Sequence, residues 1–142
     1  MYPEIMVIPM REELVRAGIK ETRTAEEVDA ALAQAGTTMV VVNSICGCAA
    51  GKMRPGVRMA LASTGNKPDQ IITVFAGQDR EATERARSYF EGQPPTSPAI
   101  AILRDGKLAY LMQRFVIEQA TAQQIGGELV RVFDQLCTPA SA

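Results

Sequence analysis

The sequence of 142 residues contains no histidine. This absence excludes a Ser-His-Asp triad, a Cys-His pair and an HExxH zinc site, because each of them needs an imidazole. Near neutral pH, the groups left to titrate are thiols, the α-amino group, and carboxylates or lysines with shifted pKa values. The chemistry of this chain is therefore expected to be thiol chemistry, carboxylate chemistry or none.

An excess of charge and long apolar runs are lacking as well. The chain has 15 Lys and Arg residues against 16 Asp and Glu, and this net charge of −1 gives no electrostatic reason to expect nucleic acid or an acidic membrane as a partner. No apolar run approaches the roughly 20 residues of a membrane-spanning helix, and the start, MYPEIMVIPMREEL, lacks the features of a secretory signal. We therefore expect a cytoplasmic protein, in which cysteine pairs stay reduced unless they are catalytic or redox-sensing.

The length predicts one domain over residues 1–142, since most domains have roughly 100–150 residues. Helices and strands alternate and are followed by an antiparallel hairpin, which predicts an α/β fold with a mixed central sheet and helices on both faces. The tail 138–142 is expected to fray. The patterns first predict a helix with Pro9 in its first turn and Gly18 at its end, a short extended segment over 19–22, and a helix that Thr24 and Glu27 cap as a capping box and that ends near Gly36. A buried strand over 37–42, a helix over 49–61 that Pro55 kinks, and a strand over 70–76 follow. The last predicted elements are a helix that Asp79 caps and Gly92 ends, strands over 99–103 and 107–112 around the turn at Asp105-Gly106, and a helix that Thr121 caps.

The motif Cys46-Gly47-Cys48 lies between the most apolar strand and the start of a helix. Reactive groups gather at the carboxyl ends of strands in open α/β sheets, and the amides of a helix N-terminus favour a thiolate over a thiol. Two cysteines separated by one residue can come within disulfide reach, with Gly47 permitting the backbone shape, but the small ring is expected to be strained and labile. Such a dithiol can attack a mixed disulfide with one sulfur and release the product with the other.

Two other interpretations of the motif stay open. Free cysteine is among the most buried residue types, so Cys46 and Cys48 can be two core thiols without redox activity. Together with Cys137 they can also ligate zinc, copper(I) or an iron–sulfur centre, although the set lacks a fourth ligand. By itself, Cys137 is a small buried apolar residue or an idle surface thiol, with an accessory or intermolecular role as the alternative.

Other residue types carry further predictions. Pro98 begins a strand, and a cis Ser97–Pro98 bond would bring Ser97 up against the strand end that bears Cys46. The methionines expected to fill the core are Met39, Met53, Met59 and Met112. The arginines expected on solvated helix faces, where one or two near Cys46 would lower its pKa, are Arg54, Arg58, Arg80, Arg85 and Arg87.

The order of elements from about Ile19 to Cys137 resembles the thioredoxin superfamily. Several strings resemble the bacilliredoxin family over nearly the whole chain, and NSxCGCAAG is highly specific. These strings are Pro9-Met10-Arg11-x-Glu13-Leu14, Val-Val-Val-Asn43-Ser44-Ile45-Cys46-Gly47-Cys48-Ala49-Ala50-Gly51, Arg54-Pro55, Val74-Phe75-Ala76-Gly77-Gln78-Asp79 and Ser97-Pro98.

The resemblance implies a thioredoxin-like fold in which CGC replaces CxxC, and an enzyme that removes bacillithiol from mixed disulfides on proteins. Cys46 would attack the bacillithiol sulfur, and Cys48 would resolve the mixed disulfide. Cys137 matches a cysteine often found near the carboxyl end of the family. The residues expected to support the pair are Asn43, Ser44, Gly47, Ser97 and Pro98, the last in the cis-proline position of the superfamily.

The implied partners are S-bacillithiolated or disulfide-bonded proteins and low-molecular-weight thiols, with no cofactor, since bacillithiol is the thiol substrate. Disulfide isomerisation or general disulfide reduction is the alternative function, and a cysteine-ligated metal or iron–sulfur carrier is a further one. The sequence departs from the family at Phe115, where an Arg-His pair is common and this chain has Arg114-Phe115. Ile45 replaces the tryptophan of thioredoxins, as expected for the CGC branch.

Overall fold

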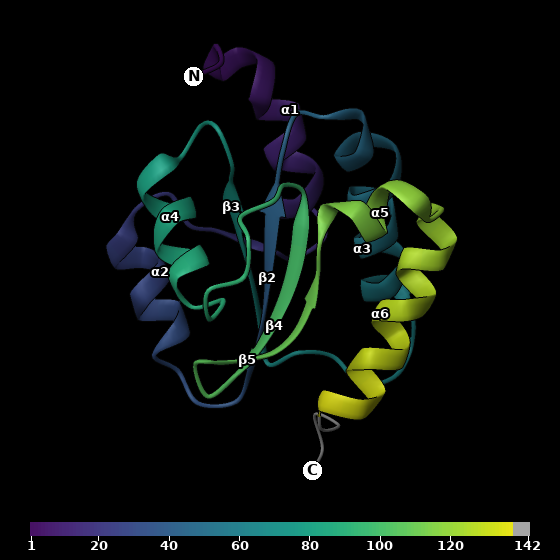
Figure 1. Cartoon of the computed structure of the whole chain (residues 1–142). Coiled ribbons are helices and arrows are strands. Elements are labelled where there is room, and N and C mark those ends of the chain that lie inside the picture. The colour runs from purple at the N-terminus through teal and green to yellow at the C-terminus, as the bar shows by residue number, and fades with distance from the viewer. Residues whose placement is uncertain (138–142) are drawn as a thin grey trace.

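A five-stranded mixed sheet forms the centre of the molecule (Figure 1). The structure is a computed structural model that describes residues 1–137; the tail expected to fray, 138–142, lies outside them. In the sheet order β1-β3-β2-β4-β5, the first three strands are parallel, and β4 and β5 are each antiparallel to the preceding neighbour. The strands are β1 Lys20–Glu21, β2 Thr37–Asn43, β3 Gln70–Phe75, β4 Ala99–Arg104 and β5 Lys107–Met112.

Helices cover both faces of the sheet (Figure 1), which confirms the predicted α/β architecture. The helices α2 and α4 pack together on one face, whereas η1, α3 and α6 pack together on the other, and α1 contacts β1 and α3. No helix among residues 1–137 is long and apolar enough to cross a bilayer. The helices are α1 Glu4–Val15, α2 Ala25–Leu32, the π-helix η1 Ala49–Met53, α3 Arg54–Ala62, α4 Arg80–Ser88, α5 Arg114–Gln119 and α6 Ala122–Leu136.

The central strand β2 separates two hydrophobic cores. All seven of its residues are buried. Because side chains alternate along a strand, Met39 and Val41 join the core beneath η1, α3 and α6, whereas Val40 and Val42 join the core beneath α2 and α4. A strand covered on both faces needs apolar side chains at consecutive positions, which is why its continuous apolar run predicted it correctly.

The predicted hairpin and the two threonine caps are present. Asp105 and Gly106 both have positive φ, at 52° and 79°, as a two-residue turn between antiparallel strands requires. The Thr121 hydroxyl accepts from the Gln124 N–H, and the Gln124 side chain completes this capping box. Thr24 accepts from the N–H of Glu27 at 3.1 Å, but the Glu27 carboxylate reaches the N–H of Arg23 rather than that of Thr24, so the second box is incomplete.

The start of the first helix differs from the prediction. α1 begins at Glu4, so Pro9 lies inside the helix rather than in its first turn. An interior proline removes one helical hydrogen bond, but the turns before it are held by a hydrogen bond to a distant residue and by an ion pair within the helix. The Tyr2 N–H donates to Gln78 Oε1 at 2.8 Å, and the Glu4 carboxylate accepts from Arg11 Nε at 2.8 Å. A local pattern contains no sign of these contacts.

Asp79 precedes α4 as predicted, but its side chain does not cap the helix. The carboxylate instead accepts two hydrogen bonds from the Arg11 guanidinium, at 2.6 and 2.9 Å. Arg11 is only 5% exposed, contacts Glu21 at 3.2 Å and lies 5.2 Å above the Phe75 ring. Because an unpaired buried guanidinium costs more than an uncapped helix end, the carboxylate pairs with Arg11 and ties α1 to α4.

Two details of the core beneath η1, α3 and α6 also differ from the prediction. The short helix α5 is absent from the predicted elements, since six residues are too few to show helical periodicity. Met59 is 43% exposed because it lies off the buried face of α3, whereas the other three methionines expected in the core are buried.

Where α3 crosses α6, a Cβ added to Gly56 would lie 2.7 Å from Ile125 Cγ2, so this crossing needs a glycine.

The buried ion pair between Arg11 and Asp79 generates a prediction about stability. Asp79→Ala should lower the free energy of unfolding by about 3 kcal/mol, because Arg11 stays buried but loses its two-pronged partner. Urea unfolding followed by circular dichroism measures this change. The matched control is Glu84→Ala, which removes the exposed Arg80–Glu84 pair on the same helix and should change stability by less than about 1 kcal/mol. Equal effects of the two substitutions would contradict an anchoring role for the buried pair.

Candidate active site

The Cys-Gly-Cys motif lies directly beyond the carboxyl end of β2. The strand ends at Asn43, the loop passes through Ser44 and Ile45, and helical geometry begins at Gly47. Both motif cysteines are half-buried free thiols that pack against the core beneath η1, α3 and α6. The structure thus brings Cys46 and Cys48 together at the helix start where the sequence placed them.

The pKa of Cys46 is lowered. Burial by itself would raise this pKa, but hydrogen bonds to the sulfur outweigh the effect of burial: the donors are the Ala49 N–H, the Cys48 thiol, the Ser44 hydroxyl and the Cys48 N–H. Both amides belong to the first helical turn, and N–H groups at a helix N-terminus stabilise a thiolate. Cys46 is therefore the thiol of this pair that is more readily deprotonated.

The pKa of Cys48 shifts in the opposite direction. Burial raises it first, followed by the hydrogen bond that the Cys48 thiol donates to Cys46 and by the negative charges of Cys46 and Glu118, while Arg114 acts against them. Two neighbouring thiols share a single negative charge more easily than they carry two. The site therefore holds one thiolate and one thiol.

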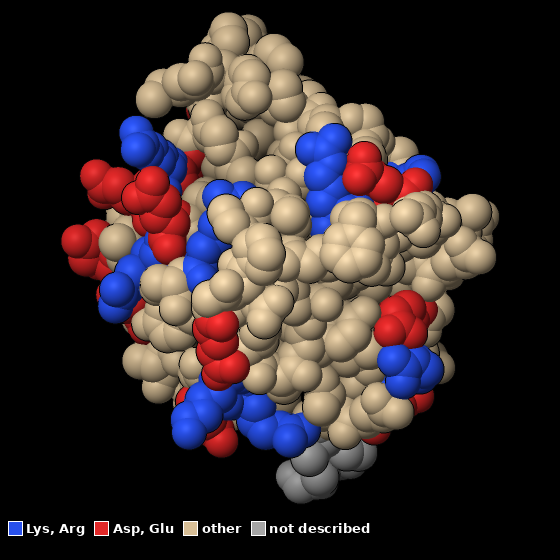
Figure 2. Space-filling view, viewed as in Figure 1, with Lys and Arg blue, Asp and Glu red and all other residues tan. Residues whose placement is uncertain are grey.

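Arg114 is the charged side chain of this site that the sequence prediction missed. The charge of the Cys46 thiolate raises the pKa of Arg114, ahead of the effect of Glu118, whose carboxylate lies 3.5 Å away. Figure 2 shows basic and acidic side chains side by side near α5. The signal for its placement was present in the hairpin: β4 starts and β5 ends at the edge where β2 ends, so the residues after Met112 return to the motif.

The Ser97–Pro98 peptide is cis and lies at the same edge of the sheet. Val42 pairs with Ala99, so the antiparallel register continues from the end of β2 to Pro98, which is buried. The Arg114 guanidinium donates to the Ser97 carbonyl oxygen at 3.2 Å. The structure thus places Ser97 and Pro98 at the end of the sheet that bears the thiol motif, and Arg114 contacts the proline loop while its charge interacts with that of Cys46.

Arg54 contradicts the expectation of a solvated helix face. Its side chain is 3% exposed, whereas that of Arg58, one turn further along α3, is 51% exposed. The Arg54 guanidinium donates to Asn43 Oδ1 and to the Ser44 carbonyl, both at 2.8 Å, and to Glu13 Oε1 at 2.9 Å. An arginine is buried only where such partners satisfy it, and here two of the three belong to the loop that leads to Cys46.

The structure also places Gly47 and Cys137, the latter in a buried position, as one of the expectations for it states. Gly47 is exposed, and a Cβ at this position would meet nothing within 4 Å, so the thiol form has no steric need for a glycine here. Cys137 is buried, and burial raises its pKa ahead of an opposing hydrogen bond from Thr37, the first residue of β2. Since Cys46 follows the last residue of that strand, roughly 20 Å separates the two ends.

The three cysteines therefore do not form a common metal site. Among residues 1–137, no group of three metal-ligating side chains comes together. The hypothesis of a metal or iron–sulfur carrier that uses Cys46, Cys48 and Cys137 required all three thiols at one place, and the position of Cys137 at the far end of β2 is incompatible with it.

Comparison with known proteins agrees with this geometry. The sequence profile of the family described as "Disulphide isomerase" matches residues 2–137. A bacilliredoxin from Koribacter versatilis is 62% identical over 138 residues, which cover 96% of this chain and 94% of the relative. Those from Salinibacter ruber and Geobacillus kaustophilus are 51% and 46% identical; each match covers 96% of this chain, and 81% and 94% of the relatives respectively. The chain belongs to the bacilliredoxin family.

Solved structures show the fold of this bacilliredoxin. A mutant thioredoxin from Halobacterium salinarum matches with a TM-score of 0.56 at 15% identity, over 85% of this chain and 92% of its own. The oxidised thioredoxin from Plasmodium falciparum matches with a TM-score of 0.53 at 13% identity, over 82% and 98%. The predicted thioredoxin-like fold is confirmed, and family and fold together identify a thiol–disulfide oxidoreductase.

Phe115 marks the departure of this bacilliredoxin from the expected Arg-His pair. Its side chain lies on α5 directly after Arg114 and is 62% exposed, and the neighbouring Val116 is 42% exposed. An imidazole at this place would titrate near neutral pH, whereas a phenyl ring carries no proton. The chain therefore presents a permanent cation followed by an exposed apolar surface on α5.

The opposite pKa shifts generate a prediction about reactivity. At pH 7, iodoacetamide should alkylate Cys46 several-fold faster than Cys48, because the lowered pKa of Cys46 gives it the larger thiolate fraction. As the pH falls through the pKa of Cys46, this rate should fall with it. The buried Cys137 should react slowest.

Timed quenching and peptide mass spectrometry measure the three rates separately. In urea the three cysteines should react at similar rates, which controls for differences in peptide recovery. Faster labelling of Cys48 in the folded protein would contradict the assignment of the thiolate to Cys46.

Proposed function

We propose that this bacilliredoxin removes bacillithiol, or a similar low-molecular-weight thiol, from mixed disulfides on cytoplasmic proteins. The observation that carries the proposal is the opposite direction of the two pKa shifts. The lowered pKa of Cys46 suits it to attack as a thiolate, and the raised pKa of Cys48 keeps it a thiol until the second step. The name of the relatives supports bacillithiol as the thiol removed. The reaction needs no cofactor, because the two thiols supply both electrons.

The first step is an exchange at the bacillithiol sulfur. The Cys46 thiolate forms a disulfide bond with this sulfur and breaks its bond to the client cysteine, which leaves as a thiolate and takes a proton from solvent. In the second step, Cys48 loses its proton and attacks the Cys46 sulfur, so that bacillithiol leaves as a thiolate. The Cys46–Cys48 pair ends oxidised by two electrons, and an external thiol must reduce it before the next turnover.

The order of the two steps follows from the causes of the pKa shift in Cys48. The hydrogen bond to Cys46 and the negative charge of Cys46 both raise that pKa. Both causes disappear when Cys46 becomes part of a mixed disulfide, since a disulfide sulfur carries no charge. The pKa of Cys48 therefore falls at the stage at which its thiolate is needed, while Arg114 continues to favour the charged form.

Disulfide isomerisation is the second candidate, favoured by the description of the matched family. In this reaction Cys46 attacks an incorrect disulfide of a client, and a client thiol then displaces Cys46 without net oxidation. Cys48 is not required for that exchange, so Cys48→Ser should keep isomerase activity on a scrambled disulfide protein but lose multiple-turnover removal of bacillithiol. A reduction potential of the pair near that of thioredoxin, about −270 mV, would favour general disulfide reduction instead.

The assigned roles predict different outcomes for the three cysteines. With an S-bacillithiolated protein as substrate, Cys46→Ser should release the client about a hundredfold more slowly than the unaltered protein, or slower still. Cys48→Ser should release the client once and then accumulate a Cys46–bacillithiol disulfide, which intact-mass and peptide mass spectrometry detect.

The matched control is Cys137→Ser, which removes a thiol at the far end of β2 and should leave turnover unchanged. A Cys46→Ser variant that reacts as fast as the unaltered protein would overturn the assigned nucleophile. If Cys48→Ser accumulates no adduct, the two-step mechanism is wrong.

A further inference from the structure

The helix α1 makes two polar contacts with the elements that flank the thiol motif. The Met10 carbonyl accepts a hydrogen bond from Asn43 Nδ2 at 3.1 Å, and the Glu13 carboxylate pairs with Arg54 Nε at 2.9 Å. These contacts span 33 and 41 positions in the sequence. The helix that precedes β1 therefore contacts the end of β2 and the start of α3, on either side of the thiol motif.

The Arg54 guanidinium connects Glu13 to this loop. One nitrogen, Nη1, donates to both Asn43 Oδ1 and the Ser44 carbonyl at 2.8 Å, and Asn43 Oδ1 also accepts from the Ser44 N–H at 2.9 Å. All three loop groups are buried, with Asn43 1% and Ser44 7% exposed. Because a guanidinium is planar and its donors have fixed directions, holding one side at Glu13 orients the other side toward Asn43 and Ser44.

The Ser44 hydroxyl completes the connection to the reacting sulfur. Its oxygen accepts from the Cys46 N–H at 3.1 Å, which places the hydroxyl next to Cys46, and a hydrogen bond from this hydroxyl is one of the causes that lower the pKa of Cys46. A hydroxyl is one donor and an acceptor, so the bond accepted from the amide fixes the oxygen and leaves the proton for the thiolate. A hydrogen bond to a charged group is roughly twice as strong as one between neutral groups.

We propose that α1 is part of the thiol site, in which Glu13 and Arg54 act as positioning residues that hold Asn43 and Ser44 so that the Ser44 hydroxyl faces the Cys46 sulfur. The inference rests on the proposed function only in taking Cys46 as the reacting thiol. Removal of any member of the series Glu13, Arg54 and Ser44 should destabilise the Cys46 thiolate relative to the thiol. The pKa of Cys46 should therefore rise.

Other charged groups lie near the thiol pair, and the test has to leave them in place. Arg114 and Glu118 lie on α5, and the Lys52 ammonium of η1 donates to the Glu118 carbonyl. Cys48 lies on the motif itself and donates to the thiolate. None of the four substitutions below changes a residue of α5 or η1, so these groups contribute equally to every variant.

The experiment measures the pH dependence of Cys46 alkylation in the reduced, full-length protein. Ser44→Ala removes the donated proton and should slow alkylation by roughly three- to tenfold at pH values below the pKa of Cys46. Glu13→Gln should also slow alkylation, but by a smaller factor, because Arg54 loses its ion pair with Glu13 and keeps its hydrogen bonds to Asn43 and Ser44. At high pH, where every variant is a thiolate, the rates should converge.

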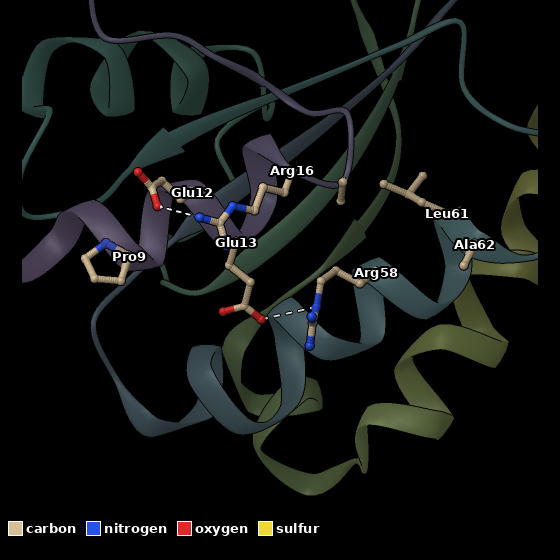
Figure 3. Close-up of a pocket in the computed structure, with 8 residues that line it drawn as sticks. Pro9, Glu12, Glu13, Arg16, Arg58, Leu61 and Ala62 are labelled. Carbon is tan, nitrogen blue, oxygen red and sulfur yellow. Dashed lines mark hydrogen bonds and ion pairs between the residues drawn. The ribbon is translucent and has the colours of Figure 1, made fainter.

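The matched control is Arg58→Gln. Arg58 lies one turn after Arg54 on α3 and pairs with the other oxygen of the same Glu13 carboxylate, at 3.2 Å, across the groove between α1 and α3 (Figure 3). Its side chain points into a cavity of about 490 Å³ rather than toward the loop. Arg58→Gln should therefore leave the pH profile unchanged, although it removes a positive charge from α3, as Arg54→Gln does.

Arg54→Gln is the stronger variant but removes a buried ion pair, so its fold is checked by circular dichroism. If it unfolds, Ser44→Ala and Glu13→Gln decide the outcome. An unchanged pH profile in Glu13→Gln would overturn the positioning role of α1, an unchanged profile in Ser44→Ala would overturn the role of the hydroxyl, and a shift in Arg58→Gln equal to that in Glu13→Gln would overturn the proposal as well. Because alkylation requires no bacillithiol, this proposal and the proposed substrate can fail independently.

Discussion

A thiolate beside a hydrophobic core needs fixed hydrogen-bond donors, and in a chain without histidine the fold itself has to supply them. At Cys46 burial opposes the charge, and the two amides of the first helical turn, the Ser44 hydroxyl and the Cys48 thiol overcome it. Amide donors are positioned when the helix forms, so they need no reorganisation when the thiolate reacts. The rest of the site holds these donors in place.

The strand β2 determines where those donors meet. Because it is buried on both faces, its direction and register are fixed by two cores. Parallel and antiparallel pairing then brings three other segments to the same edge: the Ala76 N–H after β3 donates to the Asn43 carbonyl at 3.0 Å, Pro98 precedes β4, and Arg114 follows β5. Residues that are distant in the sequence therefore come together at the edge of the sheet that bears the thiol motif.

The same geometry explains what the sequence could predict. β2, the hairpin turn and the cap at Thr121 have local signals, and each was predicted at its place. Arg54 and Arg58 look alike in the sequence, one turn apart on one helix, yet their side chains are 3% and 51% exposed. Which of them is buried depends on Glu13 and on the loop before Cys46, and no local pattern contains that information. Asp79 failed as a cap for the same reason, because its partner Arg11 is 68 positions away.

The way α1 is attached follows from its position next to the thiol loop. Its exposed side includes the apolar residues Ile5 and Ile8, and buried Arg11 lies among the residues that face the protein. Apolar contacts are non-directional and tolerate repacking, whereas guanidinium–carboxylate contacts fix both distance and orientation. Buried ion pairs often contribute less stability than apolar packing of the same volume. Here Arg11 pairs with Asp79 and Glu13 pairs with Arg54, and these two contacts hold the part of α1 whose Met10 carbonyl accepts from Asn43. The charged attachments of α1 are therefore better explained by the precision that the thiol loop demands than by a gain in stability.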